Sequence, residues 1–268
     1  MKAALRALLV LAMVVAGCAA FRALGTVANF PWSDDWTEAL LKIGLWVAPV
    51  AIALRMWGAR GYREVGAALG LTGVPARGYL FGAAACVPVL AAWPLGRALH
   101  GASVSLLVST VIVGPLAEEI LFRGWAFRQL WLRAGWPPAA ALVVSALAFG
   151  AAHMMPNLAT VRRLFDSGVP RQEWAALAVP VSAAAAGLLF GWLTWRWNSL
   201  WPAVGLHTFM NLSWQLLGGG TSAFAAVRPS SYDPSLPNAI RLSTIALAVL
   251  LTWWARRGSA AGSRSMRQ

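Results

Sequence analysis

Long apolar segments separated by short polar connections follow one another along the whole chain. A transmembrane helix needs about 20 predominantly apolar residues, and tilt or local thinning of the bilayer can accommodate a slightly shorter one. The hydrophobic pattern predicts spans over residues 3–20, 39–56, 78–99, 103–132, 139–155, 174–195, 200–217 and 240–254. We therefore expect an all-α polytopic membrane protein, with about eight transmembrane helices in one bundle.

Polar and helix-breaking residues mark the connections between these spans. Residues 57–77 carry several Arg and Gly residues and predict an interfacial loop with a short amphipathic helix. Pro137 and Pro138 end the fourth helix. Residues 196–199 predict a tight reversal into the seventh span, and residues 157–173 predict a polar loop. No internal repeat and no soluble domain boundary is visible in this pattern.

The composition supports a membrane protein and argues against a nucleic-acid binder. Hydrophobic residues make up 59% of the chain and charged residues 12%, and the mean hydropathy is +0.63. The net charge of +13 would suit a nucleic-acid partner, but the Arg residues are scattered between apolar segments and form no dense basic run. Their enrichment in alternate connections and in the tail predicts that both termini are cytoplasmic. We therefore expect the chain to lie in the lipid bilayer and to bind no nucleic acid.

The first apolar segment has two interpretations. Residues 15–18 read Val-Ala-Gly-Cys and resemble a lipoprotein cleavage box, which would remove residues 1–17 and leave Cys18 for lipidation. The alternative is a first transmembrane helix that is retained, and we favour it because many further spans follow. Cys18 and Cys86 stand apart in apolar segments, so neither a disulfide framework nor a zinc–thiolate site is indicated.

Two adjacent carboxylates, Glu118 and Glu119, lie within the fourth predicted span. An ionised side chain at mid-bilayer depth costs at least about 2.5 to 3.5 kcal/mol, so such a residue usually marks a site of function. Neighbouring helical residues point about 100° apart, whereas residues four apart share a face. Glu119 and Arg123 therefore share a face. We expect Arg123 to neutralise Glu119 and to leave Glu118 free for chemistry.

Two further spans carry polar residues on one face each. Phe149 and His153 are four residues apart on the fifth span, and His207 and Asn211 are four residues apart on the seventh. From the helical rise of about 1.5 Å per residue, Glu118, His153 and His207 lie roughly 21, 24 and 14 Å from the same side of the bundle. Antiparallel packing can bring all of them to a common level.

The chemistry of this set is that of a hydrolase without a covalent nucleophile. A carboxylate removed from water is a better base, so Glu118 with His153 could activate a water molecule. His207 and Asn211 could donate hydrogen bonds to the oxyanion that forms when this water attacks a carbonyl. The sequence contains no HExxH, GxGD or GxSxG pattern. Glu118, His153 and His207 could instead form a His2Glu metal set; we prefer a site with no metal and no cofactor.

These three patterns, EExxxR from Glu118, FxxxH from Phe149 and HxxxN from His207, stand in this order on successive predicted helices. Over about residues 78–217 the chain resembles the CPBP family of intramembrane glutamic endopeptidases, also called the Abi or type II CAAX prenyl endopeptidase family. The resemblance implies an all-helical fold of about eight spans and a metal-independent mechanism. It also implies that Glu118 and His153 activate the catalytic water and that His207 and Asn211 form the oxyanion site. Supporting roles follow for the remaining motif residues, Glu119, Arg123 and Phe149.

The resemblance divides the chain into three parts and suggests the substrate class. Residues 1–77 would hold two helices and an interfacial loop, residues 78–217 the catalytic membrane core, and residues 218–268 a loop, the last helix and a basic tail. The expected partner is a membrane-anchored peptide or protein, whether prenylated, bacteriocin-like or a C-terminal sorting tail. The Arg-rich composition resembles bacterial relatives, which predicts the cytoplasmic membrane of a bacterium. A proton-coupled carrier and a non-catalytic scaffold are the alternative functions.

Overall fold

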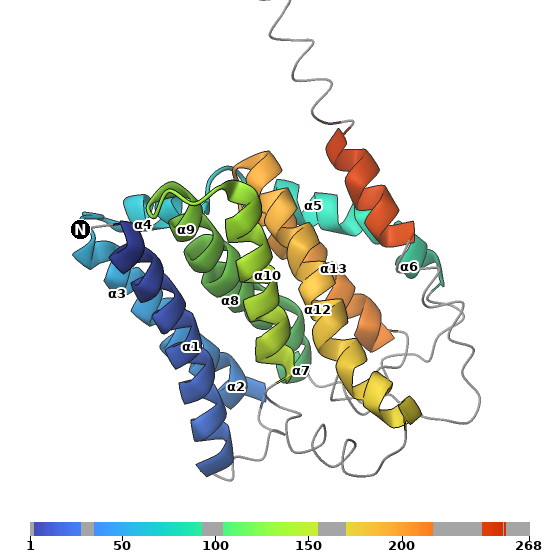
Figure 1. The fold of residues 1–268 in the computed structure, drawn as a ribbon. Helices are drawn as coiled ribbons and strands as arrows, with labels where there is room; N and C mark the ends of the chain where they lie inside the picture. The colour runs from blue at the N-terminus through green and yellow to red at the C-terminus, as the bar shows by residue number, and fades with distance from the viewer. Residues whose placement is uncertain are drawn as a thin grey trace, which may run out of the picture.

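The computed structural model describes residues 3–27, 35–92, 104–154, 170–216, 243–253 and 255, and each regular element within them is a helix (Figure 1). The elements are α1 (Ala3–Val27), α2 (Asp35–Lys42), η1 (Ile43–Val47), α3 (Ala48–Met56), α4 (Tyr62–Leu69), α5 (Pro75–Ala85), α6 (Val87–Ala92), α7 (Val104–Leu107), η3 (Val108–Val113), α8 (Gly114–Glu119), η4 (Ile120–Phe127), α9 (Arg128–Leu132), α10 (Pro138–Met154), α12 (Pro170–Trp197) and α13 (Trp201–Leu216). A further apolar helix covers Ser243–Trp253. The all-α prediction is confirmed for the described residues.

Several of these elements join into longer helices that contain π-helical turns. Residues 35–56 form one helix from α2, η1 and α3, and residues 104–132 form another from α7, η3, α8, η4 and α9. π-Helical turns inside α-helices occur frequently at functional sites. In the second helix the two glutamates close the α-helical turn between the π-helical segments η3 and η4.

Length and hydropathy support part of the predicted membrane topology. Two helical stretches, Ala3–Phe21 and Trp36–Met56, are long and apolar enough to cross a bilayer, whereas Pro138–His153 and Ser243–Trp253 are apolar but shorter. The predicted span 78–99 is interrupted at Cys86, between α5 and α6. The predicted loop 157–173 lies largely outside the described residues, and α12 begins inside it. Eight complete spans are thus a prediction that the described helices support only in part.

The helix of residues 104–132 is the centre of the bundle. Every residue of η4 is buried, which is typical of a helix enclosed by neighbours on all sides. Trp125, at the middle of η4, stacks on Trp57 at the end of α3, with ring centroids 4.9 Å apart. In Figure 1, α1 and α10 flank this central helix, and α12 and α13 continue the bundle beyond α10. The candidate carboxylates therefore stand directly before the fully buried segment η4.

Helix α1 is an integral part of the core. The carbonyl oxygen of Val10 accepts a hydrogen bond from Trp125 Nε1 at 3.2 Å, and that of Gly17 accepts one from Trp46 Nε1 at 3.1 Å. Val10 and Val14 are fully buried against the central helix. Loss of residues 1–17 would expose this surface, so the packing supports the retained first helix.

Small residues set the position of α13, which carries His207 and Asn211. A Cβ atom added at Gly78 of α5 would collide with the backbone of Trp201, and one at Gly82 would collide with the backbone of Gly205. A Cβ atom at Gly205 would in turn collide with the backbone of Gly78. Glycines four residues apart allow the closest approach of two helices in a membrane. The pair α5 and α13 therefore depends on these glycines.

Candidate functional site

The two glutamates at the end of α8 have different surroundings. Glu119 is fully buried, and its Oε1 forms an ion pair with Arg123 Nη1 at 3.1 Å. This is the i, i+4 pair that the spacing of the two residues predicts. The carboxylate and the guanidinium compensate each other in an interior that would otherwise make either charge expensive.

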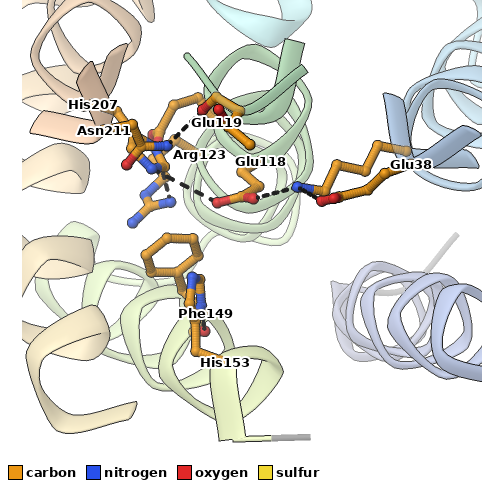
Figure 2. A network of polar contacts seen from close by, with 10 residues as sticks. Glu38, Glu118, Glu119, Arg123, Phe149, His153, His207 and Asn211 are labelled. Carbon is orange, nitrogen blue, oxygen red and sulfur yellow. Dashed lines mark hydrogen bonds and ion pairs between the residues drawn. The ribbon is translucent and has the colours of Figure 1, made fainter. Parts of the chain in front are cut away.

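Glu118 differs from the expectation, because it is not free. Its Oε1 contacts the ammonium of Lys42 at 3.0 Å, and the same ammonium contacts Glu38 Oε1 at 2.9 Å (Figure 2). Lys42 closes α2, on a different helix, so no spacing within the fourth span indicates this contact. A signal was nevertheless present in the sequence: Lys42 lies inside the predicted span 39–56, four residues after Glu38. The prediction of a free Glu118 was wrong for this reason.

His207 joins the two glutamates. Its Nδ1 is hydrogen-bonded to Glu119 Oε1 at 2.9 Å, and its Nε2 lies 3.8 Å from Glu118 Oε2. An ionised carboxylate can only accept, so Nδ1 donates and Nε2 is the nitrogen directed at Glu118. The imidazole stacks on Phe190 of α12, with ring centroids 4.8 Å apart. Phe190 was not predicted from the sequence, because one Phe in an apolar helix is indistinguishable from its neighbours.

His153 faces the same carboxylate from α10. Its Nδ1 lies 2.8 Å from the carbonyl oxygen of Phe149, which can only accept, so Nδ1 carries the hydrogen. In the neutral imidazole this leaves the lone pair on Nε2. His153 is close enough to Glu118 for the two groups to interact electrostatically, and Figure 2 shows its ring directed toward Glu118. The hydrogen bond to the helix backbone thus prepares Nε2 to accept a proton.

Phe149 contacts both Arg123 and His153. Its ring centroid is 4.2 Å from the guanidinium carbon of Arg123 and 4.4 Å from the ring of His153. A cation over an aromatic face is stabilised by about 0.5 to 2 kcal/mol. Phe149, for which a supporting role was expected, therefore packs on the counter-ion of Glu119.

Asn211 lies one turn beyond His207 on α13 and is partly buried. Its Nδ2 donates a hydrogen bond to the carbonyl oxygen of Thr110 in η3, at 2.9 Å. Figure 2 places its amide beside His207. One N–H of the amide is thus used for positioning, and the amide group has a second N–H that can serve a ligand.

The site holds an excess of negative charge. Glu38, Glu118 and Glu119 supply three carboxylates, whereas Lys42 and Arg123 supply two cations. A low-dielectric interior favours a compensated cluster. One additional proton, shared among Glu118 and the two histidines, would balance it. The arrangement can therefore exchange a proton between a carboxylate and imidazole nitrogens.

The described residues do not assemble the alternative metal set. No group of three or more His, Cys, Asp or Glu side chains among them has the arrangement of a metal site. Glu118 instead directs one oxygen to an ammonium group, and His207 uses Nδ1 for Glu119.

A helical membrane protein with a buried site of carboxylates and histidines belongs to the class of intramembrane enzymes or proton-handling carriers. Residues 100–213 match the family model described as type II CAAX prenyl endopeptidase Rce1-like. For residues 100–213 this match supports the family that the motifs predicted, the type II CAAX prenyl endopeptidases. This family is membrane-embedded and implies CAAX-type intramembrane protease activity. The matched segment contains all seven motif residues, from Glu118 to Asn211. Neither the curated proteins nor the solved structures contain a match to this chain.

Proposed function

We propose that the protein is an intramembrane glutamic endopeptidase that hydrolyses a peptide bond of a membrane-anchored substrate without a metal or cofactor. The observation that carries the proposal is the approach of His207 Nε2 to Glu118 Oε2, at 3.8 Å, with His153 facing the same carboxylate. Oε2 of Glu118 is the oxygen that Lys42 does not bind, and it is the oxygen nearest to His207. The family match favours this function over a proton-coupled carrier or a scaffold.

In the proposed first step, water attacks the scissile carbonyl carbon. Glu118 accepts the proton of the attacking water through Oε2, and His153 assists through its Nε2 lone pair. The π electrons of the carbonyl move to its oxygen, which becomes the oxyanion of a tetrahedral intermediate. In the second step this oxyanion re-forms the carbonyl, the C–N bond breaks, and the proton held by Glu118 and His153 passes to the leaving amine. The products are a carboxylic acid and an amine, so atoms and charges balance.

Stabilisation of the oxyanion is assigned to His207 and Asn211. Because Nδ1 of His207 donates to Glu119, the imidazole can donate from Nε2 as well only in its protonated form. Asn211 would contribute the second N–H of its amide. Donors positioned in advance for a developing charge are among the strongest contributions to catalysis.

The substrate is proposed to be a prenylated peptide, a bacteriocin-like peptide or the C-terminal sorting tail of a membrane-anchored protein. The proposed location is the cytoplasmic membrane of a bacterium, with both termini on the cytoplasmic side. This orientation follows from the Arg-rich alternate connections.

The test compares the purified wild-type protein with Glu118→Ala and His153→Ala on a fluorogenic prenylated CAAX peptide and on membrane-tail peptides. Glu64→Ala, which removes an exposed carboxylate of α4, is the matched control. We expect cleavage by the wild type and the control, with and without a strong chelator, and none by the two site variants. A folded Glu118→Ala protein that still cleaves would contradict the mechanism. Cleavage that is lost to the chelator and restored by zinc would instead make Glu118, His153 and His207 metal ligands.

A further inference from the structure

Lys42 contributes to the candidate site from outside the family-matched segment. It is the last residue of α2, and its ammonium connects Glu38 of the same helix with Glu118 of the central helix. The side chain of Lys42 is only 11% exposed, against 28% for Glu38. A cation in an apolar span is costly unless it is paired and has a function.

The surroundings of Lys42 hold its ammonium in one place. Nζ lies 5.6 Å from the ring centroid of Trp46 and 6.0 Å from that of Phe21, within the range of cation–π attraction. On the other side stands Gly114, one helical turn before Glu118. A Cβ atom at Gly114 would lie 3.4 Å from Nζ, so the absence of a side chain there gives the ammonium its space.

The two oxygens of Glu118 consequently have different partners. Oε1 is bound by Lys42 at 3.0 Å, whereas Oε2 is directed at His207 Nε2. The terminal torsion of a Glu side chain has a broad energy minimum, so an unanchored carboxylate would sample many orientations. Binding of one oxygen by a fixed cation determines where the other oxygen points.

We propose that Lys42 is a positioning residue of the active site, which with Glu38 holds one oxygen of Glu118 and keeps the other directed at the histidines. This inference rests on the proposed function, because it assigns Lys42 a role in that same reaction. It also means that the segment of residues 100–213 does not contain the complete site. The helix of residues 35–56 supplies the cation that compensates the charge of Glu118.

The chemistry of Lys42 also suits a different role, the binding of a carboxylate of the substrate. Its ammonium already pairs with two carboxylates of the protein, and one of these would have to be displaced. The geometry therefore favours positioning. The two roles differ in kinetics, since a positioning residue acts on kcat and a residue that binds only substrate acts on KM.

The experiment measures kcat and KM of Lys42→Met, Lys42→Arg and Glu38→Gln in detergent, on the prenylated CAAX peptide with a free and with an amidated C-terminus. For Lys42→Met we expect a loss of about 10²-fold in kcat with little change in KM, the size of effect that a misplacement of about 1 Å produces. Lys42→Arg keeps the charge and is expected to recover part of the loss. Glu38→Gln still offers an oxygen to Lys42 and is expected to lose less than Lys42→Met.

Arg55→Met is the matched control, because Arg55 is an exposed cation at the end of the same helix. We expect it to keep the wild-type kcat and KM. A folded Lys42→Met protein with the kinetics of this control would overturn the proposal. A rise in KM for the free-acid peptide alone would also overturn it and assign Lys42 to substrate binding. The same holds if Lys42→Arg is no more active than Lys42→Met.

A thermal-unfolding cycle keeps the proposal testable if a variant does not fold or no peptide is cleaved. Lys42→Met leaves Glu118 buried without its cation, whereas Lys42→Met combined with Glu118→Gln removes both charges. We expect the double variant to lose less in Tm than the sum of the two single variants. Additive losses would overturn the contact between Lys42 and Glu118. If the wild type cleaves no peptide but the Tm losses are not additive, the proposed function is rejected, whereas the contact between Lys42 and Glu118 still stands.

Discussion

Glu119 Oε1 accepts a hydrogen bond from Nδ1 of His207 at 2.9 Å and also forms an ion pair with Arg123 Nη1 at 3.1 Å. Glu119 therefore does more than neutralise a cation on its own helix. It orients the imidazole and determines which nitrogen carries the hydrogen, as carboxylates commonly do for functional histidines. Glu119 thus links Arg123 of the central helix with His207 of α13.

Replacement of Glu119 is expected to damage both stability and activity. Glu119→Ala leaves the buried guanidinium of Arg123 without its carboxylate, and breaking a buried pair in this way costs about 3 to 5 kcal/mol. It also frees His207 to rotate, so cleavage should be lost. Thermal unfolding in detergent measures the first effect and peptide cleavage the second.

The control for this prediction is the double variant Glu119→Gln/Arg123→Gln. It removes both charges, so its loss of stability should be smaller than the sum of the losses of Glu119→Gln and Arg123→Gln. An unfolding temperature of Glu119→Ala equal to that of the wild type would show that the pair contributes nothing to stability.

His207→Leu and Asn211→Leu are expected to lower kcat with little effect on KM. Each removes a donor assigned to the oxyanion, and loss of one such donor typically costs about 10²- to 10³-fold in kcat. Leu is close to Asn in size, so Asn211→Leu tests the amide rather than the volume. Steady-state kinetics on the cleaved peptide separate the two constants. A variant that raises KM and keeps kcat would place its residue in substrate binding instead.

The close packing of α5 on α13 predicts that Gly205→Ala destabilises the protein. The new methyl group would meet the backbone of Gly78, and overpacking of this kind costs about 1 to 3 kcal/mol. Because α13 carries His207, a shift of this helix should also lower cleavage. Gly44→Ala is the matched control, since a Cβ atom there has no neighbour within 4 Å and Ala favours a helix over Gly by about 0.5 to 1 kcal/mol. Equal unfolding temperatures for the two variants would contradict the packing argument.

The position of α1 in the core predicts that residues 1–17 remain in the mature protein. Val10 and Gly17 accept hydrogen bonds from two buried Trp side chains, and cleavage before Cys18 would leave those donors unpaired. The intact mass of the protein purified from membranes should include these residues and should carry no lipid on Cys18. A mass that begins at a lipidated Cys18 would establish the lipoprotein interpretation.

Local sequence patterns predicted much of this molecule. Apolar runs of helical length specified the helices, because backbone hydrogen bonds must be satisfied inside each segment in a bilayer. The pairing of Glu119 with Arg123 follows from helical spacing alone. The ordered motifs identified the family, and the family match agrees with that prediction. The interruption at Cys86 was not predicted, although Pro88, two residues later, has no backbone N–H to continue the helix and is a signal in the sequence. The π-helical turns were not predicted either.

The sequence by itself predicted the helical class, the family resemblance and the candidate site residues, since these depend on composition and on spacing within one helix. Only the tertiary structure decided which of these residues contact one another. Lys42 is 76 residues from Glu118, and His207 is 88 residues from Glu119. Contacts of this kind depend on the depth and rotation of separate helices, which are determined by close packing such as that of Gly78 against Gly205. For that reason the sequence left Glu118 free, whereas the folded chain gives each of its oxygens a different neighbour.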